Sequence, residues 1–251
     1  MKKSILKDRK LYMISITISI TIWFLLSRII NNEIIFPTIM STYTSLIDII
    51  MSPNFLIIIG YSILRSLLGF IISLLLALVI GILSSMFKSV YYLVSPVTRF
   101  LNSVPTIAII ILALIWLNSE MVPMFVGFVM VFPILYETVL KAIINTEKSI
   151  IEMANIYKVD KLTVIKDIYI PSIFISLSNI FSSTLGINLK MVIAGEVLSQ
   201  PKYAIGSNLQ LQRMYLNTSG VFAWILIILL IAKLFEYILE GIKCLCIKSK
   251  I

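Results

Sequence analysis

Residues 149–171 read SIIEMANIYKVDKLTVIKDIYIP and separate two long apolar segments of the chain. Ser149 and Glu152 have the spacing of a capping box, so we predict that a short helix begins there. Asp160 is predicted to cap a second short helix, which Pro171 ends. Two short helices that carry apolar residues and lie between hydrophobic segments indicate a docking site for another protein.

The segments on both sides of this loop, Met121–Leu140 and Ser172–Val197, are long enough to cross a bilayer. Of the 251 residues, 59% are hydrophobic and 13% are charged, whereas about 25% are charged in an ordinary soluble domain. The mean hydropathy of +1.04 averages over the whole chain, so the apolar residues are not confined to one helix. We therefore predict an all-α, polytopic integral membrane protein with six transmembrane helices.

The apolar blocks define these helices and the segments between them. Residues 13–22 alternate as a strand would, but a helix is favoured because an isolated strand leaves its backbone unsatisfied in lipid. Arg65 divides the long apolar run of residues 55–87, and Pro96 and Pro105 bend the beginning of the third span. The predicted segments are span Leu11–Ile30, external helix Thr38–Met51, interfacial stretch Phe55–Leu64, spans Ser66–Phe87, Val94–Leu117, Met121–Leu140 and Ser172–Val197, external loop Leu198–Ser219 and span Val221–Leu239.

Basic residues gather on one side of this predicted topology. Fifteen of the 21 lie in the two termini and in the loops on the same side, whereas Arg28, Lys202 and Arg213 lie on the other. The positive-inside rule places both termini and the loop around residues 145–171 in the cytoplasm. The net charge of +9 therefore reflects membrane topology, and nucleic-acid binding is not expected.

Residues that carry most enzyme chemistry are scarce. The chain has no His, which excludes imidazole acid–base catalysis and Ser-His or Cys-His nucleophiles, and we expect no catalytic, metal or cofactor site. The two cysteines, Cys244 and Cys246, lie at a basic membrane edge. They suit lipidation or a weak metal site, although two incidental thiols at a helix end is the favoured interpretation.

The second span carries a small residue at every fourth position, namely Gly69, Ser73, Ala77 and Gly81. Such a stripe lets another helix approach closely in lipid. The partner helix belongs either to the same chain or to a second subunit.

The fifth span carries Asn179, Ser183, Gly186 and Lys190 on one face, with Glu196 near its outer end. Ionisable residues in a span are costly and usually face a cavity or a partner, so this face is a candidate translocation pathway. Alternatively, Lys190 pairs with a carbonyl group or with Glu137, or Glu196 lies at the interface. Arg65 and Lys233 are expected to snorkel from the ends of their helices.

The loop resembles the coupling loop of the transmembrane subunits of binding-protein-dependent ABC importers, whose pattern is E-A-A, then Gly, then I-x-L-P. Glu152-Met153-Ala154 matches the first element, and Ile168, Ile170 and Pro171 fall at offsets of 16, 18 and 19 from Glu152. Met153 replaces the middle Ala, and Lys158 occupies the Gly position beside Tyr157. The resemblance implies that these eight residues contact an ATPase.

The resemblance extends from about Tyr61 to Cys244, and it is greatest to the nitrate, sulfonate, taurine and bicarbonate branch, which includes permeases for thiamine and pyrimidine precursors. Supporting stretches are SILRSLLGF at 62–70, SPVTRFLNSVPTIAIIILALIW at 95–116, FPIL at 132–135 and GEVLSQPKYAIG at 195–206. The implied organisation is an N-terminal segment of residues 1–60, a permease domain 61–244 that includes the coupling loop 145–171, and a tail 245–251. No Walker A loop occurs, so the ATPase is a separate chain.

The sequence thus predicts a permease subunit, not an enzyme, in a bacterial cytoplasmic membrane. The resemblance implies two ATPase subunits that bind the ATP, a second permease copy as a homodimer or a related permease as a heterodimer, and an extracytoplasmic solute-binding protein. The substrate is a small solute, either an anion such as a sulfonate or nitrate, or a thiamine or pyrimidine precursor. An ion-gradient-driven secondary transporter or channel is the alternative, although the spans offer few carboxylates for ion sites.

Overall fold

The regular elements over residues 2–248 are all helical in the computed structural model, which describes the backbone of these residues and the side chains of 11–147, 149–160, 162–239 and 241. Five helices are long and apolar enough to span a membrane, and a sixth span is obtained if the bent pair α4–α5 counts as one. The all-α polytopic fold class is therefore confirmed. The cysteine side chains discussed above lie outside the described residues. The helices are α1 Lys2–Ile30, α2 Ile39–Met51, α3 Phe55–Met86, α4 Lys88–Ser103, α5 Thr106–Trp116, α6 Val122–Ile144, α7 Lys148–Ile156, α8 Lys161–Val164, the π-helix η1 Ile165–Tyr169, α9 Ile170–Ser199, α10 Ile205–Met214 and α11 Thr218–Lys248.

Contacts divide the chain into two compact units. Unit 1 comprises residues 1–56 and 208–229, and unit 2 comprises 57–207 and 230–251. Within unit 1, the Trp23 indole donates a hydrogen bond to the Pro37 carbonyl, and its ring lies 5.5 Å from that of Phe222. Residues 13–22 are helical, as predicted, and their hydroxyls bond to carbonyls one turn earlier, as Thr17 Oγ1 does to Met13 O at 3.0 Å.

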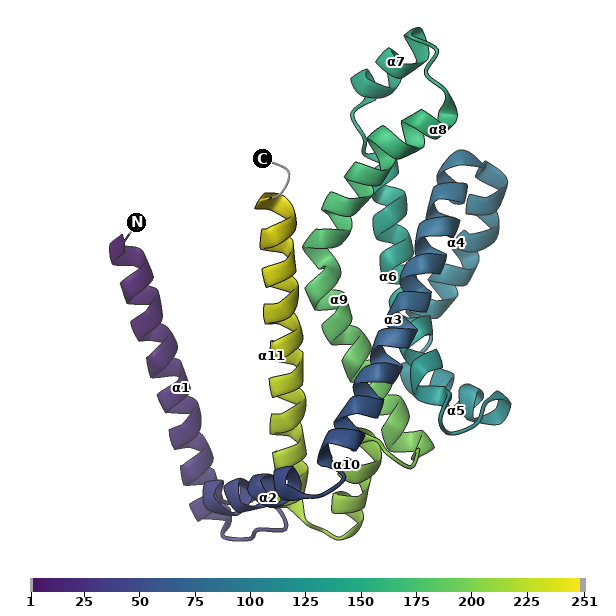
Figure 1. Ribbon diagram of the computed structural model, residues 1–251. Helices are drawn as coiled ribbons and strands as arrows, with labels where there is room; N and C mark the ends of the chain where they lie inside the picture. Colours follow the sequence, from purple (N-terminus) through teal and green to yellow (C-terminus); the bar gives the residue numbers. More distant parts are fainter. Residues whose placement is uncertain (1, 249–251) are drawn as a thin grey trace. The chain divides into compact units, whose positions relative to one another are not determined.

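Unit 2 is built around the pair α6 and α9, which lie side by side (Figure 1). The core between them and α3 contains large apolar residues with almost no exposed surface, including Phe70, Leu135 and Tyr136. Close packing of this kind drives helix association in lipid, where apolar surface alone gives no preference for protein over acyl chains. The α7–α8 hairpin lies at one end of α9, and the turn before α10 lies at the other end (Figure 1).

Helix α3 is continuous over 32 residues, so the predicted interruption at Arg65 is wrong, whereas the interfacial position of Phe55–Leu64 stays a prediction. The prediction assumed that a cation interrupts a span because burying it in lipid is costly. Arg65 is instead only 6% exposed and forms ion pairs inside unit 2, so it needs no break in the helix.

The small residues of α3 pack against α6 within the chain. A Cβ atom at Gly69 would lie 2.7 Å from the Met124 carbonyl oxygen, and one at Gly81 would lie 2.7 Å from a Val139 methyl group. Between them, Ser73 donates a hydrogen bond to Phe128 O at 3.0 Å, and Ala77 is fully buried. The stripe therefore brings two helix backbones together, and no larger residue fits at its two glycines without displacement.

The predicted span Val94–Leu117 is formed by two helices, α4 and α5. The chain bends by 108° between them. Pro96 lies inside α4, and the sharp bend occurs at Pro105, which precedes the first residue of α5. Proline has no N–H and restricts the preceding residue to extended conformations, and Val104 is extended at φ −76° and ψ 131°. The bend thus follows from the proline.

Helix α9 continues the second helix of the loop without a break, so Pro171 does not end that helix as predicted. Residues 165–169 form one turn of π-helix, in which the Ile170 N–H bonds to the Ile165 carbonyl. The wider turn accommodates the ring of Pro171, whose missing N–H would leave an α-helical carbonyl without a donor. The continuous span covers Leu162–Ser199, and the predicted external loop that follows contains α10.

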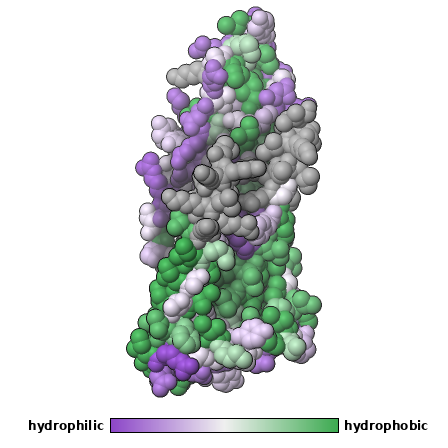
Figure 2. Space-filling view, turned by 90° about the vertical axis from the view of Figure 1, so that its left-hand side faces the viewer, coloured by the Kyte–Doolittle hydropathy of each residue, from purple (hydrophilic) through white to green (hydrophobic). Residues whose placement is uncertain are grey.

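The surface is largely apolar, as lipid contact requires. In Figure 2, hydrophobic residues form a broad area in the lower half of the face shown, and hydrophilic residues lie along its upper left side and at the bottom. Exposed Leu, Ile and Phe side chains are spread along α1, α3 and α9.

Candidate functional site

The first helix of the α7–α8 hairpin is capped by a different residue from the one predicted. Helix α7 starts at Lys148 with Glu147 at the N-cap, and the Ser149 hydroxyl donates to the Glu147 carboxylate at 2.7 Å. The capping box of Ser149 and Glu152 is therefore wrong, because the serine hydroxyl is taken by the preceding glutamate. The cap at Asp160 is confirmed, since Asp160 Oδ2 accepts from the Thr163 N–H at 3.1 Å. Hydrogen bonds from the Thr163 hydroxyl and backbone hold the pKa of Asp160 below its ordinary value.

The turn between α7 and α8 is a Schellman motif with Lys158 at the left-handed position. Val159 N bonds to Ala154 O at 2.9 Å, Lys158 N bonds to Asn155 O at 3.1 Å, and Lys158 has φ 53°. Glycine adopts this conformation freely, whereas other residues pay about 1 kcal/mol or more. Lys158 thus makes the left-handed turn at the position where the resembled sequence pattern has glycine.

Lys158→Gly should relieve this strain and stabilise the turn by about 1 kcal/mol. Hydrogen exchange of the Val159 amide, whose bond to Ala154 closes the motif, should then slow by about fivefold, because this free-energy difference changes the open fraction by that factor. Lys166→Gly is the control. Lys166 lies in a helix, where glycine is unfavourable, so the amides around residue 166 should exchange faster. Unchanged exchange in Lys158→Gly would mean that the left-handed conformation carries no strain.

The hairpin exposes apolar side chains and also contributes to a groove. Ile156, Tyr157 and Leu162 are each 77% exposed, far more than a self-contained loop would leave in water. The groove has a volume of about 370 Å³. Its lining includes Met153, Ala154, Tyr157, Val159, Val164 and Ile168.

The remaining predicted coupling residues lie on the same hairpin or just beyond it. Glu152 and Lys158 are exposed, and Met153 is 54% exposed. Ala154 is buried, whereas Ile170 is 49% exposed and Pro171 is half-buried at the start of α9. The structure therefore places five of the eight residues on the hairpin. Ile168 lies on η1, where it lines the groove, and Ile170 and Pro171 lie at the start of α9.

The predicted pathway residues of α9 follow an exposed face of this chain. Asn179, Ser183 and Lys190 are exposed, and Gly186 has no atom within 4 Å of where a Cβ would lie. No ion pair joins Lys190 to another of the described side chains. The alternative partner Glu137 instead pairs with Lys141 at 3.1 Å. Lys190 is therefore a cation on an open helix face, and its role in a pathway stays a prediction.

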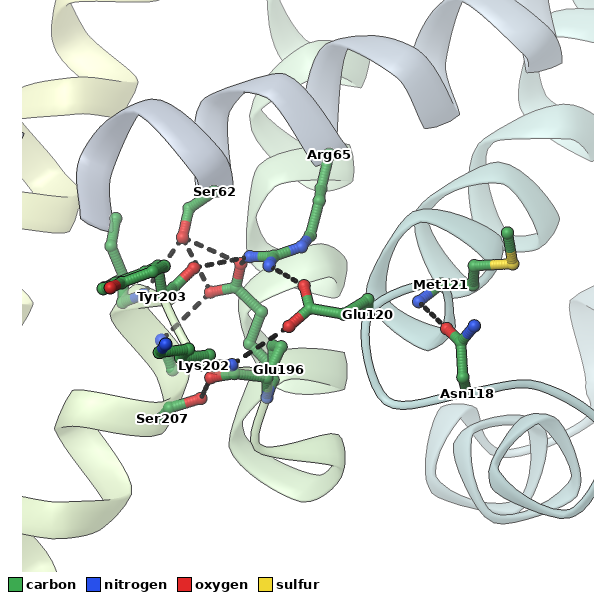
Figure 3. Close-up of polar contacts among 12 residues, drawn as sticks. Ser62, Arg65, Asn118, Glu120, Met121, Glu196, Lys202, Tyr203 and Ser207 are labelled. Carbon is green, nitrogen blue, oxygen red and sulfur yellow. Dashed lines mark hydrogen bonds and ion pairs between the residues drawn. The ribbon is translucent and has the colours of Figure 1, made fainter. Parts of the chain in front are cut away.

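Glu196 lies in the interior of unit 2, away from that exposed face. Its side chain is fully buried and accepts hydrogen bonds from Ser62 Oγ at 2.8 Å, Arg65 Nη1 at 3.0 Å and Gly206 N at 3.0 Å (Figure 3). The prediction that Arg65 snorkels is wrong, because its guanidinium turns inward to these acceptors. A buried carboxylate needs such donors, since an unpaired charge is very costly in a low-dielectric interior. A pathway role for Glu196 is untested and stays a prediction.

Glu120, in the turn between α5 and α6, completes this charged network (Figure 3). Its carboxylate pairs with Arg65 Nη2 and accepts from the Lys202 backbone N–H at 3.1 Å. Partial burial raises the pKa of Glu120, but the bonds from Arg65 and Lys202 and the Arg65 charge outweigh it, so the pKa lies below its ordinary value. The carboxylate therefore remains ionised at neutral pH. Arg65 also donates to the Tyr203 carbonyl at 2.8 Å.

Ser62, Glu120 and Asn188 also belong to the interior of unit 2, although their positions in the sequence did not indicate it. Asn188 donates to the Ser66 carbonyl at 2.6 Å and has no exposed surface. One feature of the sequence could have indicated this interior. A cation and a carboxylate, Arg65 and Glu196, both lie at span depth, where each needs a partner. Their pairing joins positions 131 residues apart, which local spacing does not reveal.

Comparisons with known proteins identify the family and the fold. A family model described as "Binding-protein-dependent transport system inner membrane component" matches residues 73–242. A chain of the MetNI methionine ABC transporter, solved in inward-facing conformations, has a similar fold with a TM-score of 0.64 and 13% sequence identity. The match covers 76% of this chain and 97% of that chain. No curated protein matches the sequence significantly.

The protein is thus a polytopic subunit of a membrane transport system. The chain belongs to the family of binding-protein-dependent transport system inner membrane components, because the family model covers more than half of its length. It is a permease subunit of an ABC importer, as the coupling-loop resemblance implied.

Proposed function

We propose that this permease couples to a separate cytoplasmic ATPase through the α7–α8 hairpin. The observation that carries the proposal is the exposure of Ile156, Tyr157 and Leu162 on a hairpin that also contributes to a largely apolar groove. Apolar surface of this kind is stabilised when a partner removes it from water. Glu152 and Lys158 lie beside it and can form charged contacts with the partner.

The importer operates with two copies of this chain, two ATPase subunits and an extracytoplasmic solute-binding protein. Its hairpin and both termini lie in the cytoplasm of a bacterium, as the distribution of basic residues favours. ATP binding closes the ATPase pair, moves the two hairpins and switches the side from which the pathway opens. The exposed polar face of α9 supports a pathway between the two copies, because a polar face is costly against lipid.

The transported solute is small, and Lys190 on the exposed face of α9 favours an anion such as a sulfonate or nitrate. Among the described residues, the carboxylates of Glu137 and Glu196 have other cationic partners, so Lys190 keeps its charge available. ATP-driven uptake of sulfonates, nitrate and thiamine or pyrimidine precursors into proteoliposomes distinguishes these solutes. Uptake of a thiamine or pyrimidine precursor, without uptake of sulfonates or nitrate, would overturn the preference for an anion.

Glu152→Lys tests the coupling role. We expect loss of ATPase co-purification and of ATP-driven uptake, with membrane insertion intact, because a reversed charge at an exposed position disturbs an interface and not the fold. Asp48→Lys, an exposed carboxylate on α2, is the matched control and should retain both activities. Normal ATPase binding by Glu152→Lys would overturn the coupling assignment. Uptake that persists without ATP and collapses with an ion gradient would overturn the importer itself.

A further inference from the structure

Helix α2 runs crosswise to α1, close to the end of α1, within unit 1 (Figure 1). The Thr38 hydroxyl accepts a hydrogen bond from the Ser41 N–H at 3.1 Å and caps the first turn of α2. On one side, Ser45 Oγ lies 2.9 Å from Ser219 Oγ of α11, so the helix is packed against the rest of the unit. Its 13 residues extend only about 20 Å, which is too short to cross a hydrocarbon core of about 30 Å. Helix α2 therefore lies beside the spans without being one of them.

The side chains of α2 form three faces. The face packed within unit 1 consists of buried and half-buried residues, namely Thr42, Ser45, Leu46 and Ile49. A polar face carries Thr44 and Asp48, which are exposed and lie one turn apart. The third face is apolar, and five of its six members are between 37% and 80% exposed. We call it the α2 apolar face, and its members are Ile39, Met40, Tyr43, Ile47, Ile50 and Met51.

We propose that the α2 apolar face is buried among lipid acyl chains at the membrane–water interface, so that α2 is an in-plane anchor for the end of α1. A helix with large apolar side chains on one face and polar ones on another is typical of this location, because the apolar face enters the boundary between headgroups and acyl chains. Thr44 and Asp48 then remain on the water side. Tyrosine is enriched at this level of a membrane, and Tyr43 is 56% exposed on the apolar face.

The α2 apolar face continues the exposed apolar surface of α1. Exposed apolar side chains run along α1 and extend to its end and beyond it, at Ile29, Ile34 and Ile35, which are 77%, 56% and 64% exposed. The Trp23 indole donates to the Pro37 carbonyl, which holds the connecting segment against the last two turns of α1. An apolar surface thus extends along the chain from α1 to α2. This anchor role depends neither on the ATPase nor on the transported solute.

The residue types on the two sides of α2 favour lipid over a second copy of the chain. Helices that pack closely in a membrane approach each other through small residues. The packed face has such residues in Thr42 and Ser45, whereas each member of the α2 apolar face is Ile, Met or Tyr. Water is unfavourable for the same face, because large apolar area would stay solvated. Helix α2 carries no cation and one carboxylate, Asp48, so apolar burial holds it and attraction to anionic headgroups does not.

The collision accessibility of a spin label distinguishes lipid, water and protein at each face. The native cysteines are first replaced (Cys244→Ser, Cys246→Ser), and a single cysteine is then introduced in the full chain as Tyr43→Cys or Asp48→Cys. The labelled protein, purified with the subunits that accompany it, is placed in nanodiscs of neutral phosphatidylcholine. Oxygen concentrates among acyl chains, whereas a nickel chelate stays in water. We expect the ratio of oxygen to nickel accessibility to be roughly tenfold higher at residue 43 than at residue 48.

Three results would overturn the anchor. A label at residue 43 that neither reagent reaches would mean that protein, such as a second copy of the chain, covers the α2 apolar face. A label that nickel reaches as readily as it does at residue 48 would mean that the face lies in water. A high ratio that requires anionic phosphatidylglycerol in the nanodisc would mean that charge, and not apolar area, holds the helix.

Ile50→Glu tests whether apolar burial keeps α2 in place. Residue 50 lies two turns from residue 43 on the α2 apolar face, so a carboxylate there should draw the helix towards water and lower the ratio at residue 43 by roughly threefold or more. Thr44→Glu is the matched control, because it adds the same carboxylate to the polar face and should leave the ratio unchanged. Equal ratios in the two variants would overturn the anchor. If Ile50→Glu does not fold, the labels at residues 43 and 48 decide alone.

Discussion

Arg65→Ala should destabilise the protein by about 3–5 kcal/mol, because it leaves the fully buried Glu196 carboxylate without its cation. The lost bond to the Tyr203 carbonyl also frees the α9–α10 turn. Thermal unfolding in detergent, followed by size-exclusion chromatography, should show a midpoint lower by on the order of 10 °C.

Arg99→Ala is the matched control, because Arg99 is an exposed cation on α4 and its loss should change the midpoint little. The double variant Arg65→Met, Glu196→Met should recover much of the lost stability, since apolar residues of similar volume often replace a buried ion pair at small cost. Equal midpoints for Arg65→Ala and Arg99→Ala would show that Glu196 needs no cation at this site.

Gly69→Leu should have a comparable effect through packing. A Cβ at residue 69 would lie 2.7 Å from the Met124 backbone oxygen, so the whole leucine side chain must push α3 away from α6. Overpacking costs about 1–3 kcal/mol, and contact with a backbone atom places this variant at or above the upper limit. The same unfolding assay, together with ATP-driven uptake, measures the loss.

Gly60→Leu is the control in the same helix, because no atom lies within 4 Å of a Cβ built at Gly60. It should match the wild type or stabilise α3 slightly, since leucine favours the helix more than glycine does. If the two variants unfold at the same temperature, the close approach of α3 and α6 contributes nothing to stability.

Five of the six predicted transmembrane helices followed from the sequence, because each carries its own signal in about 20 apolar residues, whereas the third span is the bent pair α4 and α5. The ends of the helices were less predictable, since they depend on distant groups. Arg65 looked like a break in an apolar run, whereas Glu196, 131 residues later, satisfies it inside the protein. The start of α7 differed for a local reason, because the Ser149 hydroxyl donates to the carboxylate of Glu147 two residues before it.

The hairpin that carries the candidate coupling residues was recognisable from spacing within one short segment, because Glu152, Lys158 and Pro171 are close in sequence. The conformation of its turn was not predictable, because a left-handed lysine is rare and the residue type argues against it. The charged network joins four separate segments of unit 2. Only the folded chain brings Ser62, Glu120 and Glu196 together around Arg65.

The unbroken helix from Leu162 to Ser199 has a mechanical consequence. Its 38 residues form a rod about 57 Å long, because each residue adds about 1.5 Å. For a rod of that length, a tilt of about 5° at one end displaces the other end by about 5 Å. The π-turn at 165–169 lies near the hairpin, so bending there would leave about 30 residues to move as one arm. If the helix does not bend at this turn, a displacement of the hairpin that tilts the rod also moves its far end at Ser199.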